Sequence, residues 1–395
     1  MSQQNDYFEN YELSDNLEYY NTFESEELGL NDEILKGIYS YGFEKPSQIQ
    51  RVGIKPIIDG KDVVIQSHSG SGKTATFIIG LLQRMDPLLK EPQCIIISNT
   101  RELADQTLKV FTQIAKYTNF TCNLCIGGDM QYKYNANNVK ENVIIGTPGR
   151  MCDLMNKDII KSDNIKLIIV DEADDVLSIS FRKQVKRIFQ KIPKESQVVL
   201  VSATIPTEMS ELFNSLMKPD FSTILVKNEE LTLDGISQYY INIDEQYKLD
   251  ALTDLYKFIS IGQAIIYCNK KSKTEELKYC LTDKSFSVSV LHGDMMQKER
   301  DDVMKEFRSG KTRILVTTDI LSRGIDIQQI SLVINYDMPL SPQTYLHRIG
   351  RGSRYGRRST TINFVIKREN NILNHIRKLY NTKIIQLPSN VSELL

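Results

Sequence analysis

The sequence predicts two α/β domains in tandem, each built on a doubly wound parallel sheet. Short runs rich in Ile and Val alternate with segments of helical character, and these runs are apolar along their whole length. Strands of a parallel sheet are covered by helices on both faces, so their sequences are expected to be continuously apolar. The alternation stops at a polar stretch and then begins again. A chain of 395 residues is also too long for one ordinary domain.

The first domain is predicted to span residues 23–226. Its expected strands are 63–66, 94–98, 143–146, 167–171 and 198–202. A helix is expected over 73–85, directly after a glycine-rich turn. Residues 1–22 precede this domain and are rich in Asn, Tyr and acidic residues without periodicity, which predicts a disordered tail.

The second domain is predicted to span residues 236–395, after a polar linker over 227–235. Its expected strands are 264–268, 288–291, 314–318, 332–336 and 361–366. Helices are expected over 272–281 and 297–308. No sequence repeat relates the two domains, but the architecture is doubled. In sheets of this kind ligands bind beyond the carboxyl ends of the strands, and the motifs described below lie there.

Composition and charge exclude several classes of protein. The chain is 41% hydrophobic and 25% charged, which is typical of a globular protein. No run of eighteen apolar residues exists, and the first ten residues lack the features of a secretory signal. Ten acidic residues and no Lys or Arg precede Lys36, so the rest of the chain carries a formal charge of +9 although the whole carries −1. The positive charge of residues 36–395 is compatible with a polyanionic partner.

The six cysteines do not form a disulfide framework. Cys122 and Cys125 are the one close pair, and they lie in a strand-like stretch. The four histidines are scattered along the chain. Zinc and redox chemistry both need more partners than this, so we expect ordinary intracellular thiols.

Two segments, each at the end of an apolar run, together describe a site for a nucleoside triphosphate. The first is Ser69-Gly70-Ser71-Gly72-Lys73-Thr74, and the second is Asp171-Glu172-Ala173-Asp174. A glycine-rich turn cradles phosphates with backbone N–H groups, a Lys neutralises them, and a Thr hydroxyl meets Mg²⁺. The carboxylates supply the other side of the metal ion and a group that orients water. The pair of segments therefore predicts ATP hydrolysis.

The first segment alone has an alternative interpretation, a plain strand-to-helix turn with a capping Ser. The general phosphate-loop pattern requires Gly where this chain has Ser67. The acidic segment argues against a plain turn, because two carboxylates at the edge of a sheet need a cation to be stable.

Further motifs resemble those of the DEAD-box RNA helicases, a name that residues 171–174 spell. In the first domain the matching segments are Gly42–Gln50, Thr100-Arg101-Glu102-Leu103-Ala104, Gly127-Gly128, Thr147-Pro148-Gly149-Arg150 and Ser202-Ala203-Thr204. In the second domain they are Ile266-Tyr267-Cys268-Asn269, His292-Gly293, Thr317-Thr318-Asp319, Arg323-Gly324-Ile325-Asp326 and His347–Arg354. The resemblance covers about residues 23–395 and implies two RecA-like domains. Residues 41–47 and 230–236 are similar to the eukaryotic translation initiation factor 4A group.

Three positions depart from the usual pattern of that family. Asn99 stands where the family usually has Pro, Ser322 replaces Ala, and Ser353 replaces Gly. If position 353 requires a positive φ, Ser is strained there and shifts Arg354. None of the three removes a charged group that the chemistry needs.

The resemblance implies a role for each residue around the phosphates. Lys73 holds the β- and γ-phosphates, whereas Thr74 and Asp171 hold Mg²⁺. Glu172 positions and deprotonates the attacking water. The remaining loop residues of this cofactor site are Ser69, Gly70, Ser71 and Gly72.

The resemblance also implies an adenosine pocket. Gln50 reads adenine through a two-pronged amide hydrogen bond, and Phe43 and Lys45 line that pocket, with Phe23 as the upstream aromatic residue. Asp326 accepts a hydrogen bond from the ribose. Without this context, Gln50 would be interpreted as an amide on the surface of a helix.

Arg351 and Arg354 are the catalytic residues that the resemblance implies in the second domain. An arginine finger contributes roughly 10³–10⁵ in rate, so hydrolysis would require the two domains to close. The alternative is a solvated basic face, because residues 348–358 contain five arginines.

Four residues are implied to couple the ATP and RNA sites: Ser202, Thr204, Asp174 and His347. For Ser202 and Thr204 the alternative is a capping or turn role at the end of a strand.

The predicted RNA contacts offer small groups, backbone donors or guanidinium, which suit phosphates and sugars better than base edges. They are Arg101, Gly128, Thr147, Gly149, Arg150 and Thr317. A plain turn is the alternative for residues 147–149. A site that contacts 2′-hydroxyl groups distinguishes RNA from DNA without reading sequence.

The resemblance thus implies an ATP-dependent RNA helicase that uses ATP and Mg²⁺, binds single-stranded RNA between its two domains and unwinds RNA structure in translation initiation. An ATP-gated RNA clamp in a ribonucleoprotein complex is the alternative, and an enzyme that acts on DNA is a third. The expected partners are RNA of any sequence and scaffold proteins of translation initiation, without a membrane. We expect a monomer in the cytoplasm, with the nucleus as the alternative location.

Overall fold

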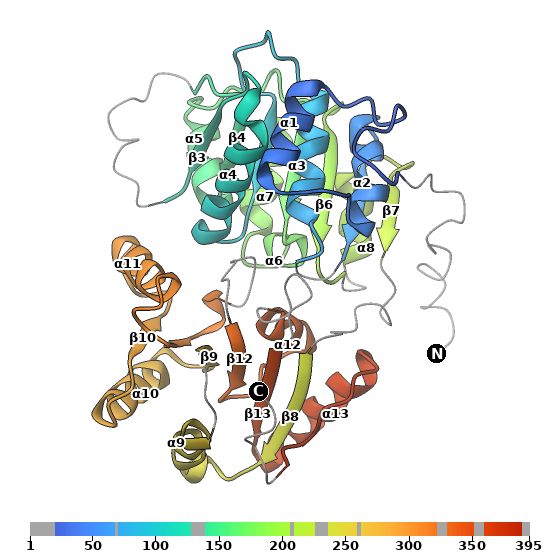
Figure 1. Ribbon diagram of the computed structural model, residues 1–395. Helices are drawn as coiled ribbons and strands as arrows, with labels where there is room; N and C mark the ends of the chain where they lie inside the picture. The colour runs from blue at the N-terminus through green and yellow to red at the C-terminus, as the bar shows by residue number, and fades with distance from the viewer. Residues whose placement is uncertain are drawn as a thin grey trace. The chain divides into compact units, whose positions relative to one another are not determined.

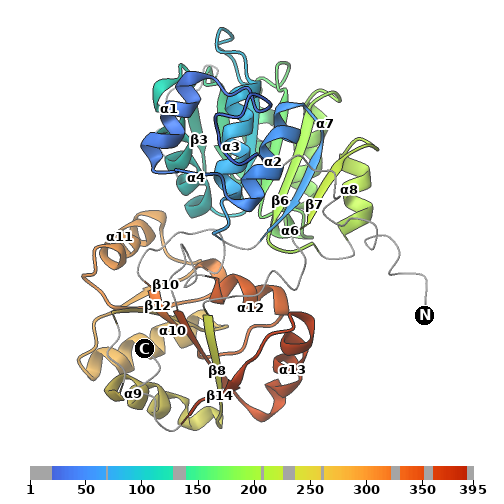
Figure 2. The ribbon, with the colours of Figure 1, turned by 45° about the vertical axis from the view of Figure 1, so that its right-hand side comes forward.

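The computed structural model contains two compact units, Met1–Lys227 and Asn228–Leu395. It describes residues 20–67, 70–127, 139–205, 209–225, 236–258, 262–321, 330–350 and 359–388. Each unit has one seven-stranded sheet with helices on both faces (Figures 1 and 2). All of the strand pairs within these sheets are parallel. The predicted fold class, two doubly wound α/β domains in tandem, is confirmed.

The sheet of the first unit has the strand order β3-β4-β2-β5-β6-β1-β7. Its strands are β1 (Val63–Gln66), β2 (Cys94–Ile97), β3 (Cys122–Cys125), β4 (Val143–Gly146), β5 (Leu167–Asp171), β6 (Gln197–Ser202) and β7 (Ser222–Leu225). Successive residues of a strand point to opposite faces of a sheet. In β2, Ile96 therefore packs in the core on one face, and Ile95 packs in the core on the other.

Four helices cover each face of this sheet. The first face is covered by α1 (Asp32–Tyr41), α2 (Gln48–Ile58), α3 (Lys73–Arg84) and α4 (Arg101–Ile114). The second is covered by α5 (Pro148–Asn156), α6 (Ala173–Val176), α7 (Arg182–Lys191) and α8 (Ser210–Leu216). Because both faces are covered, β2, β5 and β6 are buried along their whole length and are mainly apolar, as the sequence predicts.

Gly37 allows α1 to approach the end of α4. A Cβ atom at this position would lie 1.8 Å from the carbonyl oxygen of Ile114. We expect Gly37→Ala to lower the free energy of unfolding of the first unit by at least about 1–3 kcal/mol, because backbone atoms must move. Gly262→Ala is the matched control, since nothing lies within 4 Å of its added Cβ. Urea denaturation measures both variants, and equal midpoints would contradict the expectation.

The sheet of the second unit has the order β10-β11-β9-β12-β13-β8-β14. Its strands are β8 (Ile236–Asn242), β9 (Gln263–Tyr267), β10 (Val288–Leu291), β11 (Ile314–Thr317), β12 (Ile330–Asn335), β13 (Ser359–Val365) and β14 (Ile385–Gln386). One face is covered by α9 (Lys248–Phe258) and α10 (Lys271–Asp283). The other is covered by α11 (Gln297–Arg308), α12 (Pro342–Ile349) and α13 (Asn370–Leu379).

Each predicted strand corresponds to an observed one, and the ends differ by at most two residues. The predicted set lacks β3, β7, β8 and β14. β3, β7 and β14 lie at an end of a sheet, β8 lies next to one, and β14 has only two residues. Strands in such positions carry less apolar sequence. Only two of the seven residues of β8 are buried, so it does not form a continuous buried run.

The predicted tail and linker lie largely outside the described residues, which begin at Tyr20 and omit 226–235. The predicted tail includes Tyr20, but the side chain of Tyr20 is only 5% exposed and belongs to the same core as Phe23. The folded part of the chain therefore includes the last residues of the predicted tail, because an aromatic side chain there is buried against the domain.

Cys122 and Cys125 lie on β3 three positions apart, so their side chains point to opposite faces of the sheet. Burial raises the pKa of the Cys125 thiol to about 12. All six cysteines are free thiols. The Cys-x-x-Cys spacing is thus a feature of an edge strand. In the part of the chain that the structure describes, no helix is long and apolar enough to cross a bilayer.

Candidate functional site

The phosphate loop connects β1 to α3. Gly70 and Gly72 have φ values of +84° and +103°, a region that side chains other than glycine rarely adopt. The side chain of Lys73, the first residue of α3, donates from Nζ to the carbonyl oxygen of Ser67 at 2.6 Å. Residue 69 lies outside the described residues. The loop therefore brings a Lys ammonium group and the amino end of a twelve-residue helix together, which suits an anion.

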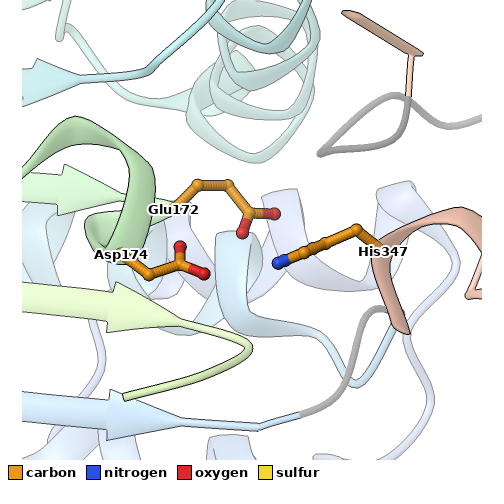
Figure 3. Close-up of side chains that lie close together, drawn as sticks. All are labelled: Glu172, Asp174 and His347. Carbon is orange, nitrogen blue, oxygen red and sulfur yellow. The ribbon is translucent and has the colours of Figure 1, made fainter. Parts of the chain in front are cut away.

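The acidic segment forms a sharp turn between β5 and α6. Glu172 has a φ of 51° in the left-handed region, which is uncommon for a residue with a side chain. The carboxylates of Glu172 and Asp174 both project from this turn (Figure 3). Asp171 is only 3% exposed and accepts a hydrogen bond from the backbone N–H of Glu172 at 3.0 Å. The turn therefore concentrates three carboxylates at the end of one strand.

Burial, followed by the charge of Glu172, raises the pKa of Asp171 to about 7, although Lys73 opposes this shift. The buried Asp171 carboxylate thus resists ionising unless a cation compensates its charge. Mg²⁺ prefers oxygen ligands, and Thr74 supplies a hydroxyl in the first turn of α3. The donor set of Thr74 and Asp171 fits a divalent cation.

Ser202, Thr204 and Asp174 form one hydrogen-bonded network. Thr204 Oγ1 donates to Asp174 Oδ2 at 2.7 Å, and Ser202 Oγ donates to the carbonyl oxygen of Thr204 at 2.6 Å. The backbone N–H of Asp174 lies 3.4 Å from Ser202 Oγ. Ser202 and Thr204 are 2% and 7% exposed. Three of the four predicted coupling residues therefore lie together, at the ends of the adjacent strands β5 and β6. The fourth, His347, lies on α12 of the second unit, and Figure 3 labels it as well.

Gln50 is buried at the start of α2, with an exposure of 1%. Its Oε1 accepts from the backbone N–H of Ser47 at 2.8 Å, whereas Nε2 has no hydrogen-bond acceptor among the described residues. Ser47 Oγ donates to the carbonyl oxygen of Ser71 at 2.7 Å and so joins α2 to the phosphate loop. A buried amide with an unused donor does not match an amide on a helix surface. One lone pair of its carbonyl is already in use, so a two-pronged contact would depend on the second.

The aromatic residues near Gln50 form a cluster. Phe43 is half-buried, with its ring centroid 6.5 Å from that of Phe23 and 4.8 Å from that of Tyr41. Phe23 is fully buried, so it supports Phe43 from behind and offers no exposed face of its own. Lys45 is exposed.

The predicted RNA contacts of the first unit follow neighbouring strands. Arg101 is the first residue of α4 and lies against Gly127, where an added Cβ would be 3.1 Å from the guanidinium group. Thr147 precedes α5, and Gly149 on its first turn is exposed with open space around it. Arg150 pairs with Asp153 at 3.0 Å and remains partly exposed. Because β2 and β4 are adjacent, these residues share one edge of the sheet. Gly128 lies outside the described residues.

Thr317 does not provide the exposed hydroxyl that its predicted RNA contact requires. Its side chain is fully buried at the end of β11. Its Oγ1 contacts the carbonyl oxygens of Leu291 at 2.9 Å and Thr318 at 3.0 Å. The hydroxyl thus stabilises the end of the strand. Thr318, the next residue, is half-exposed.

Arg348 is a residue whose environment the sequence did not reveal. Its side chain is fully buried and donates from Nε to Asp319 at 2.6 Å. Its Nη2 donates to Asn269 Oδ1 at 2.7 Å and to Asp319 at 3.1 Å. Its Nη1 donates to the carbonyl oxygen of Asp337 at 2.7 Å and to Asn335 Oδ1 at 3.2 Å. A solvated basic face is therefore wrong for this arginine.

The signal that could have identified this cluster is the polar residues beyond β9, β11 and β12. Asn269, Asp319 and Asp337 each follow one of these strands by two residues, and such positions meet at one edge of a parallel sheet. The predicted ribose contact Asp326 and the predicted catalytic residues Arg351 and Arg354 lie outside the described residues.

Comparison with known proteins agrees with these motifs. Residues 47–212 match the family model of the DEAD/DEAH box helicases, and residues 247–356 match the helicase conserved C-terminal domain. The chain is 50% identical over 371 residues to the ATP-dependent RNA helicase eIF4A of Kluyveromyces lactis, with 93% of each chain covered. It is 48% identical over 370 residues to the protein of the same name from Aspergillus oryzae, covering 93% of this chain and 88% of that one.

Solved structures show the same similarity. Dbp5 of S. cerevisiae bound to RNA and ADP BeF3 is 36% identical, with a TM-score of 0.88 and coverage of 93% of this chain and 96% of that chain. Mss116p bound to ssRNA and AMP-PNP is 26% identical, with a TM-score of 0.82 and coverage of 92% and 78%. The two domains are thus RecA-like, and the chain belongs to the DEAD-box helicase family.

Proposed function

We propose that this protein is an RNA-stimulated ATPase that unwinds RNA structure, as an ATP-dependent RNA helicase of translation initiation. The observation that supports this function most directly is the arrangement at one edge of the first sheet. The phosphate loop, the acidic turn and the Asp174–Thr204 hydrogen bond follow β1, β5 and β6, and β6 pairs with both of the others. The two relatives named above carry the name ATP-dependent RNA helicase eIF4A, and the two solved structures hold RNA together with a nucleotide analogue.

In this proposal Lys73 neutralises the β- and γ-phosphates, and backbone N–H groups of the loop bind their oxygens. Thr74 and Asp171 hold Mg²⁺, which when bound neutralises charge on the phosphates. Glu172 orients the attacking water and accepts its proton. Its carboxylate is suited to that role because the turn places it directly after Asp171.

The second domain contributes residues that only the family resemblance assigns. Arg351 and Arg354 stabilise the transferred phosphate, and Asp326 binds the ribose. His347 joins Asp174, Ser202 and Thr204 in the coupling of the ATP and RNA sites.

Single-stranded RNA binds through its phosphates and sugars along the turns of Arg101, Thr147, Gly149 and Arg150. Exposed backbone at Gly149 and a partly exposed guanidinium at Arg150 support this assignment. We also propose that scaffold proteins of translation initiation are its partners, and that it acts as a monomer in the cytoplasm.

Strand displacement and ATPase assays on the full chain test this function together. With a short RNA duplex that carries a single-stranded overhang, we expect ATP-dependent displacement over multiple turnovers. RNA should stimulate ATP hydrolysis more than DNA of the same sequence. Slow turnover, with RNA retained for many minutes, would favour the ATP-gated clamp. Equal stimulation by DNA would contradict recognition of RNA.

Gln50→Ala is expected to weaken ATP binding about tenfold, because the variant removes the buried amide that we assign to adenine. Binding of adenine and guanine nucleotides should also become more similar. Gln48→Ala is the matched control, since Gln48 is an exposed amide on the same helix. Titration with fluorescent ATP and GTP analogues measures both effects, and unchanged selectivity would remove Gln50 from the adenine pocket.

A further inference from the structure

Asn99 and Asp175 form a hydrogen bond between two segments that are far apart in the sequence. Asn99 follows β2 by two residues, and Asp175 lies in α6, just after β5. Asn99 Nδ2 donates to Asp175 Oδ2 at 2.7 Å. β2 and β5 are neighbouring parallel strands with Ile97 opposite Val170, so the segments that follow them lie side by side. A hydrogen bond with one ionised partner is roughly twice as strong as one between neutral groups.

The polarity of this contact follows from its chemistry. An ionised carboxylate only accepts hydrogen bonds, so the amide nitrogen of Asn99, rather than its oxygen, faces Asp175. Proline, the usual residue of the family at position 99, has neither an amide side chain nor a backbone donor. The contact is therefore a property of this chain and depends on its departure from the family pattern.

Asn99 adjoins a predicted RNA-binding turn, and Asp175 is hydrogen-bonded to a residue beside the ATP site. Asn99 precedes Thr100, whose Oγ1 accepts from Leu103 N at 3.2 Å and caps the helix that begins at Arg101. On the other side, the backbone N–H of Asp175 donates to Asp174 Oδ1 at 3.1 Å. The other oxygen of Asp174 accepts from Thr204. The contact thus connects the turn that precedes Arg101, a predicted RNA-binding residue, to the Asp174–Thr204 hydrogen bond beside the ATP site.

We infer that Asn99 is a positioning residue that couples RNA binding at Arg101 to the acidic turn of the nucleotide site. This inference rests on the proposed function. RNA that orders the amino end of α4 also fixes Asn99, and Asn99 fixes Asp175 and its link to Asp174. By linkage, nucleotide that orders the acidic turn stabilises the RNA-binding position of α4 to the same extent.

Reversing the polarity of the pair tests the inference. Asn99→Asp places two carboxylates against each other, so the RNA concentration for half-maximal ATPase stimulation should rise at least about fivefold. Asp175→Asn retains an amide-to-carbonyl hydrogen bond and should have a smaller effect. The double variant Asn99→Asp with Asp175→Asn restores a charge-assisted bond with donor and acceptor exchanged. In this double variant the RNA concentration for half-maximal ATPase stimulation should return to within about twofold of that of the unmodified chain.

A variant that is only less stable would not raise the RNA concentration for half-maximal ATPase stimulation and at the same time keep its affinity for ATP without RNA. ATP titration in the absence of RNA therefore accompanies each assay. Asp105→Asn is the matched control, because it neutralises an exposed carboxylate on α4 that pairs with Lys109. An unaffected Asn99→Asp variant, or a double variant as impaired as Asn99→Asp, would overturn the inference alone. Absence of RNA stimulation in the unmodified chain would overturn the proposed function and this inference with it.

Discussion

Replacing Glu172 by Gln is expected to lower ATP turnover of the RNA-saturated protein by about 10²–10⁴-fold, because an amide cannot accept the proton of the attacking water. The substitution keeps the size of the side chain and the turn at φ 51°. Asp171 and Lys73 also remain in place. Binding of ATP and RNA should therefore persist, and single-turnover hydrolysis together with equilibrium binding separates the two effects.

Glu195→Gln is the matched control for this experiment. Glu195 is an exposed carboxylate of the same unit, and the same chemical change there should leave turnover intact. Normal turnover in Glu172→Gln would show that another group activates the water. A parallel loss of ATP binding would instead indicate that Glu172 holds the nucleotide or its metal ion.

Replacing Arg348 by Met is expected to lower the free energy of unfolding of the second unit by about 3 kcal/mol. Removing one partner of a buried ion pair costs about 3–5 kcal/mol, and the lower value applies because the side chain of Asp319 is 41% exposed. The substitution leaves the acceptor oxygens of Asn269, Asn335 and Asp337 without their donor. It also removes the guanidinium that lies 5.1 Å from the ring centroid of Tyr267.

Urea denaturation, followed by signals from each unit, measures this effect. Arg368→Met is the matched control, because Arg368 is exposed and its loss should change stability little. Adding Asp319→Asn to Arg348→Met should recover part of the loss, since it removes the uncompensated charge. A midpoint equal to that of the control would contradict the structural role of Arg348.

The sequence predicted the central strands and the places where the motifs lie, for one physical reason. Strands covered on both faces are mainly apolar, so β2, β5 and β6 can be predicted from one sequence alone. The polar residues that follow such strands gather at one edge of the sheet. Asp171 is the last residue of β5 and Lys73 begins the helix after the loop that follows β1, as predicted, although the position of a strand end does not determine their contacts.

The sequence could not predict contacts that depend on which way one side chain points. Thr317 is the last residue of β11 and turns its hydroxyl into the sheet, whereas a turn position one residue later would expose it. Arg348 stands among other arginines in the sequence, and nothing in its neighbouring residues indicates that its side chain is buried. Its burial depends on Asn269, Asp319 and Asn335, which come from distant parts of the chain. The Asn99–Asp175 contact could not be predicted either, because it also joins residues from distant parts of the chain.

Coupling between the ATP and RNA sites of one molecule can be measured as the affinity for single-stranded RNA in the presence of different nucleotides. With a non-hydrolysable ATP analogue and Mg²⁺, we expect RNA to bind at least about tenfold more tightly than with ADP. The analogue should be bound more tightly by the same factor when RNA is present, because coupling is reciprocal. Equal RNA affinity in the two nucleotide states would show that the ATP and RNA sites are not coupled.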